Sequence, residues 1–101
     1  MRVMMIARMP HKEFNAALKA GSAGQKMNAI LEDLKPESVY FTEMNGLRTA
    51  VLVVNIEKST QIPSVAEPWF LTFNADVEFH PTMSPEDLQQ AGLDKLGKKW
   101  A

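Results

Sequence analysis

Hydrophobic and polar residues alternate in four segments of the chain, and this alternation predicts four β-strands. The segments are Arg2 to Met9, Ser38 to Met44, Leu47 to about Ile56, and Ala75 to Pro81. In the first and third segments both alternating sets are apolar, as in a central strand that is covered on both faces. The fourth segment alternates Val77 and Phe79 with polar side chains, so we expect it to be half buried.

Between the first and second strands, apolar residues recur with the helical period from Phe14 to Leu34. The stripe ends at Lys35, because a residue that precedes proline avoids the helical region. We expect one long helix here. Its centre is weak at Gly21 to Gly24, since each interior glycine costs about 1 kcal/mol relative to alanine.

Two further helices are expected in the second half of the chain. One is predicted from a cap at Ser59 to about Asn74, with Pro63 in its first turn and a kink at Pro68. The other is predicted within residues 84–101, where a serine, a proline and two acids form a helix N-terminus before a last apolar stripe.

The dipeptide Asn45-Gly46 separates the second and third strands and is typical of a two-residue hairpin turn, because both residues tolerate positive φ. The predicted order is therefore βαββαβ followed by a helix, which indicates an α+β fold of the ferredoxin-like type with an antiparallel sheet. In that arrangement the helices cover one sheet face and the first and third strands are central. Since both of these strands are apolar on both faces, we expect the uncovered face to meet a second copy in a homodimer.

The composition is that of one small globular domain spanning residues 1–101. The chain has 46% hydrophobic residues, 11 Lys and Arg against 12 Asp and Glu, and no Cys. The absence of Cys excludes a disulfide framework, a thiolate metal site and a cysteine nucleophile. The near-neutral balance lacks the basic footprint of a nucleic-acid-binding protein, and no segment is apolar enough to span or target a membrane. We therefore expect a cytoplasmic protein with neither a nucleic-acid nor a membrane partner.

Polar residues on the predicted sheet offer limited chemistry. Glu78 and His80 lie two residues apart on one strand face and form either an acid–base pair, two ligands of a metal site, or simply a solvated edge. Arg8 ends the first strand and either binds a ligand carboxylate or pairs with Glu78. Tyr40 is a candidate proton donor or a contact of the dimer. We take Arg8, Tyr40 and His80 as the candidate catalytic residues, with no metal site.

The second predicted helix carries aromatic residues that favour either a ligand pocket or a core. Trp69 and Phe73 are the candidate pocket residues, together with Met5 on the first strand, while Met9 and Met27 would supply an adaptable wall. The alternative is that the aromatic stripe is the buried side of an amphipathic helix.

Residues 2–81 resemble a known superfamily in their order of elements and in three segments. These segments are the strand Tyr40 to Glu43 before the hairpin turn, the aliphatic strand Ala50 to Val54 and the helix with Pro68-Trp69-Phe70. The chain resembles the dimeric α+β barrel superfamily, which includes antibiotic-biosynthesis monooxygenases and muconolactone isomerases. The resemblance implies two sheets that close into a barrel across a dimer, with a small pocket in each subunit. It also implies that pocket residues of the monooxygenase members correspond to Asn15, Tyr40, Trp69 and His80.

The sequence therefore predicts a small homodimeric protein that binds an organic metabolite in an apolar pocket. A cofactor-independent monooxygenase or isomerase is the candidate activity, and no cofactor is expected. The competing hypothesis is a non-catalytic binding or assembly module that uses the dimer face and the C-terminal helix.

Overall fold

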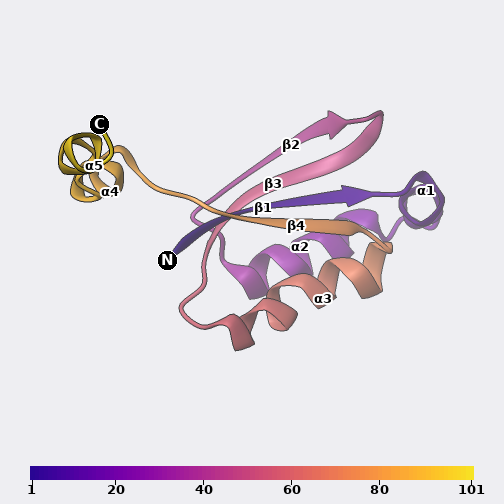
Figure 1. The fold of residues 1–101 in the computed structure, drawn as a ribbon. Helices are drawn as coiled ribbons and strands as arrows, with labels where there is room; N and C mark the ends of the chain where they lie inside the picture. The colour runs from indigo at the N-terminus through magenta and orange to yellow at the C-terminus, as the bar shows by residue number, and fades with distance from the viewer.

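A computed structural model describes residues 1–101 and has ten elements (Figure 1). They are β1 (Arg2–Met9), α1 (His11–Lys19), α2 (Ala23–Leu34), β2 (Ser38–Met44), β3 (Leu47–Asn55), the 3₁₀ turn η1 (Ser59–Gln61), α3 (Ile62–Phe73), β4 (Asp76–Pro81), α4 (Pro85–Gln90) and α5 (Leu93–Lys99). The four predicted strands are all present, with ends that differ by a residue or less.

The strands form one antiparallel sheet in the order β2-β3-β1-β4. The helices α2 and α3 lie on the same side of this sheet (Figure 1). The fold is therefore α+β with a four-stranded antiparallel sheet, and its strand order is consistent with the predicted ferredoxin-like arrangement. β1 and β3 occupy the central positions, as their two apolar faces indicated.

The register divides the sheet into two rows of side chains. On the side of α2 and α3, which we call the covered face, Met5 lies opposite Leu52 and Phe79. One residue further along β1, Ile6 lies opposite Val51 and Glu78 on the other side, which we call the open face. No helix of the sheet-and-helix body lies over the open face (Figure 1).

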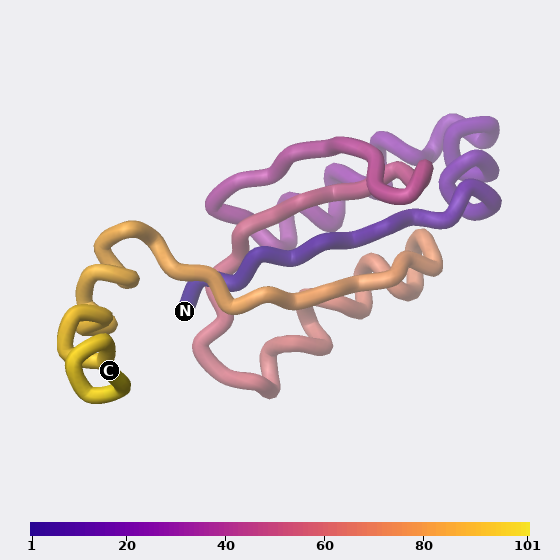
Figure 2. Tube along the Cα trace, turned by 45° about the horizontal axis from the view of Figure 1, so that its top comes forward, coloured from indigo at the N-terminus to yellow at the C-terminus, as the bar shows by residue number.

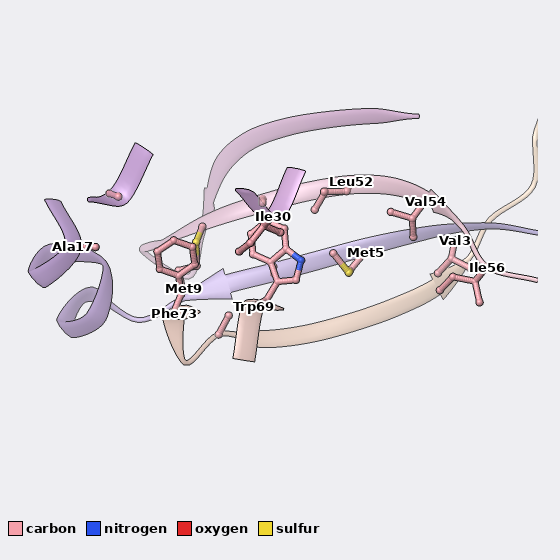
Figure 3. Close-up of a cluster of buried hydrophobic side chains, with 14 residues drawn as sticks. Val3, Met5, Met9, Ala17, Ile30, Leu52, Val54, Ile56, Trp69 and Phe73 are labelled. Atoms are coloured by element: carbon pink, nitrogen blue, oxygen red, sulfur yellow. The ribbon is translucent and has the colours of Figure 1, made fainter. Parts of the chain in front are cut away.

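The core fills the space between the covered face and the helices (Figure 3). Its largest fully buried members are Trp69 and Phe73 from α3 and Met5, Met9 and Leu52 from the sheet. Phe14 of α1 stacks on Phe73 with ring centroids 5.2 Å apart. The aromatic stripe of α3 is thus the buried side of an amphipathic helix.

The prediction of one long helix after β1 is wrong. Gly21 has a φ of +75°, which ends the regular backbone after α1, and α2 begins only at Ala23. Because a left-handed residue cannot continue a right-handed helix, the chain turns at this glycine. Figure 1 shows α1 nearly end-on while α2 runs along the sheet, so the two helices point in different directions.

The helix predicted from Ser59 begins later than expected. Residues 59–61 form a 3₁₀ turn and α3 starts at Ile62, so Ser59 does not cap it. The side-chain oxygen of Gln61 instead accepts the backbone N–H groups of Glu57 and Lys58 at 2.7 and 3.0 Å. Pro63 does lie in the first turn and the helix ends at about Asn74, as predicted, with Asn74 itself in a left-handed conformation.

The two turn signals near β2 and α4 are confirmed. Asn45 and Gly46 both have positive φ and join β2 to β3. Ser84 caps α4, because its hydroxyl accepts the N–H of Asp87 at 3.1 Å while the carboxylate of Asp87 accepts the N–H of Ser84 at 3.0 Å. The single last helix, however, is two helices, since Gly92 at a φ of +73° separates α4 from α5.

Residues 82–101, which we call the C-terminal arm, stand apart from the sheet and the other helices (Figure 2). The core cluster contains no residue of the arm. The arm is fixed only at its root, where the N–H of Thr82 donates to the carbonyl of Arg2 at 3.1 Å and Asp87 lies 3.7 Å from the Arg2 guanidinium. Its larger apolar side chains are therefore exposed: Met83, Leu88, Leu93, Leu96 and Trp100.

Candidate functional site

The open face carries a small ionic cluster at its β4 edge. The Nη1 atom of Arg8 lies 2.9 Å from Oε2 of Glu78, and Nε2 of His80 lies 3.7 Å from the same oxygen. The hydrogen bond from Arg8 holds the pKa of Glu78 below its usual value, and its charge and His80 act in the same direction. The pairing of Arg8 with Glu78, one of the two alternatives that the sequence left open, is present.

Arg8 is more enclosed than its partners. Its side chain is 20% exposed, its Nη2 donates to the sulfur of Met44 at 3.6 Å, and its Nε is buried without a partner. Arg8 therefore extends over the open face between β4 and the end of β2. A charged group held in this way has a fixed position, which both catalysis and subunit contacts require.

The three candidate catalytic residues share the open face but do not form one constellation. Arg8 and His80 are linked through Glu78. Tyr40 lies on the edge strand β2, opposite Val51, and is 71% exposed with no side-chain hydrogen bond. No group of three His, Cys, Asp or Glu side chains is placed to hold a metal ion.

The candidate pocket residues Met5, Trp69 and Phe73 are all 0% exposed and belong to the core between sheet and helices (Figure 3). None of them lines a cavity of the structure. The indole N–H of Trp69 is buried among these apolar side chains without a hydrogen-bond acceptor.

An open apolar groove of about 520 Å³ lies instead beside this core, between the two N-terminal helices and the β2–β3 hairpin. We call it the α1–α2 groove. Its wall is mainly apolar and is formed by Met9, Phe14, Leu18, Ala23, Met27 and Phe41. The volume and the apolar wall are typical of small-molecule sites, which measure about 300–1,000 Å³.

Arg48 is the single charged residue of this groove. It comes from β3, is partly buried, and donates from Nη1 to Oδ1 of Asn15 at 2.8 Å. Its guanidinium carbon lies 4.9 Å from the centre of the Phe14 ring, a cation–π contact. The groove thus combines an apolar wall with one oriented cation.

Only indirect signs of this groove are present in the amino-acid sequence. Met9 and Met27 were expected in the wall of a pocket at Trp69 and Phe73, and they line this groove instead, whereas Arg48 was not among the expected site residues. The groove exists because the chain turns at Gly21, so that α1 and α2 diverge, and because Gly24 leaves open space where a side chain would stand. The weak Gly21 to Gly24 segment, which we interpreted only as the weak centre of one helix, is the signal that could have located it.

A second cavity, of about 500 Å³, lies at the root of the C-terminal arm and is polar. Its arginine is already paired, because the Arg2 guanidinium forms two hydrogen bonds of 3.0 and 3.1 Å with the carboxylate of Glu37 from Nε and a third of 3.1 Å from Nη2. These bonds raise the pKa of Arg2 and lower the pKa of Glu37. The site joins the N-terminus to the start of β2, and its guanidinium is already paired, while Lys35 at the same cavity forms no salt bridge.

No family model and no curated protein sequence matches the chain. Among solved structures, the de novo designed protein Ferredog-Diesel is similar to it, with a TM-score of 0.45 and 7% sequence identity, over 80% of this chain and 85% of the designed one. None of the helices has both the length and the apolar character needed to cross a membrane.

Proposed function

We propose that the protein is a homodimer that binds a small organic molecule in the α1–α2 groove of each subunit. The observation that carries this proposal is the groove itself, an apolar cavity of about 520 Å³ with a single oriented cation. A groove of this kind removes the ligand surface that lies against its wall from water, while the charge fixes the orientation of the ligand.

The dimer is proposed from the open face. Its central rows consist of Met4 and Ile6 on β1 and Val51 and Val53 on β3, flanked by the exposed Tyr40. An apolar sheet face of this kind is typical of an interface, and a two-fold axis would bring the same face of a second copy onto it. Two sheets packed in this way would give the dimeric α+β barrel that the sequence resembles.

A catalysed reaction would take place on the open face and not in the groove, because the candidate catalytic residues lie on the open face. Arg8 and Met9 are neighbours on β1, so Arg8 points to the open face while Met9 lines the groove on the other side of the sheet. The monooxygenase or isomerase activity thus depends on a substrate between the two sheets of the dimer, with Arg8 as the electrostatic group and His80 or Tyr40 as the proton donor. Arg8→Ala and His80→Ala should abolish turnover of any substrate that is found, and unchanged turnover would remove these residues from catalysis.

Native mass spectrometry of the purified protein tests the proposed function directly, because it reports the subunit number and any retained ligand together. We expect a dimer, with additional mass of up to one small molecule per subunit. A monomer at micromolar concentration would refute the dimer. A dimer that neither retains nor acquires a small organic molecule in titrations would refute the binding function.

The alternative function, an assembly module, is favoured by the shape of the chain. Its accessible surface is 7051 Å², whereas a compact protein of 11.3 kDa exposes about 5,700 Å². Its radius of gyration is 16.9 Å, against about 13 Å for a compact domain of this length. The excess surface exceeds the roughly 800 Å² that each partner buries in a standard interface. The C-terminal arm accounts for this excess surface. We propose that a second copy of the chain packs against the arm.

The arm also has a charge pattern that suits a second copy. α5 carries Lys95 and ends with Lys98 and Lys99, and the exposed edge strand β4 presents the carboxylate of Asp76. Sedimentation equilibrium of a full-length Leu93→Gln, Leu96→Gln variant tests this contact. We expect a dimer at least tenfold weaker than the wild type, because two exposed leucines lose their apolar contacts. An unchanged dimer constant would show that the arm does not contribute to assembly.

A further inference from the structure

Arg48 is a partly buried cation with no counter-charge in its own chain. The residue opposite it in the β2–β3 register is Glu43, an acid that would pair with Arg48 across the strands. Glu43 turns to the hairpin instead, where its Oε2 accepts the N–H of Gly46 at 2.9 Å. The salt bridges of the structure involve Arg2, Arg8 and His80, and none involves Arg48. Because charges withdrawn from water are normally paired, the missing partner of Arg48 is unexplained within the fold.

The guanidinium is nevertheless held in position by neutral groups. Asn15 accepts one N–H of Nη1 at 2.8 Å, and the ring of Phe14 packs at 4.9 Å from the guanidinium carbon. A guanidinium has five N–H donors in one plane, so a single acceptor leaves most of its donor edge unused. Asn15 and Phe14 thus orient the cation without neutralising it, which is what a site for a bidentate carboxylate requires.

The wall of the groove restricts which kind of molecule can carry the carboxylate. Apart from Arg48 the lining has no charged residue, and most of it is apolar. A nucleotide or a sugar phosphate would leave polar groups buried against this wall without partners, which is costly. An apolar chain or ring would instead be withdrawn from water, and the flexible side chains of Met9 and Met27 would adapt to its shape.

We propose that the α1–α2 groove binds an amphipathic organic acid, with its apolar body against Met9, Met27 and Phe41 and its carboxylate on the free donor edge of Arg48. This inference rests on the proposed binding function and adds the chemical class of the ligand. The carboxylate of the ligand would supply the negative charge that Arg48 lacks within its own chain.

Three compounds with the same apolar chain test the proposal: decanoate, decanol and decylamine. They are titrated into the full-length protein with isotope-labelled methionine methyl groups. The chain has 7 Met residues, of which Met9 and Met27 report on the groove, while Met1 and Met83 lie outside it. We expect decanoate to shift the Met9 and Met27 signals with an affinity about tenfold or more above that of decanol, since a charge-assisted pair adds to the same apolar contact. Decylamine is expected to bind least well.

Two variants and a matched control assign the preference to Arg48. Arg48→Met should reduce the affinity for decanoate to that for decanol and leave the affinity for decanol within about twofold. Lys26→Met removes the same charge from an exposed position of α2 outside the groove, and it should keep the full preference for the acid. Gly24→Leu places a side chain in the open space at Gly24 and should weaken the binding of decanoate and decanol equally.

The outcomes separate this inference from the function on which it rests. If decanol shifts Met9 and Met27 as strongly as decanoate, the groove binds small molecules but the anionic class is wrong. The same holds if Arg48→Met keeps the preference for decanoate. If none of the compounds shifts these two signals, or if all seven methionine signals shift alike, the groove is not the binding site and the proposed function itself is overturned.

Discussion

The two faces of the sheet have the same strands, and both carry apolar side chains on the central strands β1 and β3, yet only one of them has a core. On the covered face, Met5 and Leu52 lie under α2 and α3 and are completely buried. On the open face, Ile6 is buried only by its neighbours in the sheet, and Val51 and Val53 remain partly exposed. The difference arises because both helices of the body lie on one side (Figure 1).

This comparison shows how a chain of 101 residues acquires surface that its own fold does not use. A small domain has too few helices to cover both sides of a four-stranded sheet. Apolar side chains on the uncovered side then need a partner, because large exposed apolar areas are rare on isolated proteins. The polar row of β4 limits this surface to the centre of the sheet, and thereby restricts how a second copy can approach.

The largest effect is expected at the covered face. Phe73→Ala should lower the free energy of unfolding by about 3–5 kcal/mol, because it leaves a cavity beside Trp69 and removes the contact with Phe14. Urea denaturation, at a protein concentration where assembly is held constant, measures this change. A cost below about 1 kcal/mol would mean that the covered face is not the tightly packed core that we describe.

A smaller effect is expected at the open face, and it should concern assembly and not folding. Tyr40→Ala should weaken the dimer by about 2 kcal/mol, or roughly thirtyfold, because exposed aromatic residues dominate interface energies. Sedimentation equilibrium measures the change. Phe41→Ala is the matched control, since Phe41 is 56% exposed on the next position of β2 and points to the groove. Equal weakening by both variants would contradict the assignment of the open face as the interface.

The two glycines around the helix break should respond in opposite directions. Gly24→Ala should stabilise the protein by about 0.5–1 kcal/mol, because the new methyl group meets nothing within 4 Å and alanine favours a helix. Gly21→Ala should destabilise it by about 1–2 kcal/mol, because its φ of +75° is strained for alanine. Thermal unfolding of the two variants compares them, and stabilisation by Gly21→Ala would show that α1 and α2 form one helix in solution.

The smallest effect is the pH dependence of the ionic cluster on the open face. The pKa of Glu78 is lowered from its ordinary value of 4.5 by Arg8, so its ionised form stabilises the folded protein. This contribution is complete above the ordinary pKa and is lost as the pH falls through the lowered one. Glu78→Gln should therefore lower the urea midpoint slightly at about pH 7, and the difference should disappear toward about pH 2. A difference that persists in acid would point to packing and not to charge.

Local signals in the sequence predicted most of the fold. The Asn45-Gly46 turn, the Ser84 cap and the alternating strands each depend on residues that are neighbours in the chain, and all are present as expected. The long first helix was wrong because the apolar stripe continues through Gly21 without a break. A glycine in the middle of a stripe is compatible both with a weak helix and with a turn, and the packing of α1 against Phe73 favours the turn.

The candidate sites were predicted less completely, since a site depends on which residues meet. The sequence singled out Arg8, Glu78 and His80 as neighbours across two strands, and the register brings them together. It also selected aromatic residues of α3 for a pocket, but periodicity alone does not distinguish a core from a pocket wall. Arg48 was missed because its significance lies in Glu43 turning away from it, which no spacing in the chain reveals.

The sequence by itself determined the strands, their two apolar faces and the ends of several helices, because these follow from residue periodicity and from turn and cap chemistry over a few neighbouring positions. Only the tertiary structure decided which face the helices cover, that the chain turns at Gly21 to open the α1–α2 groove, and that the arm after β4 leaves the body. These features depend on contacts between residues far apart in the chain, whose balance of burial and backbone conformation is fixed only when the whole sheet and its helices are assembled.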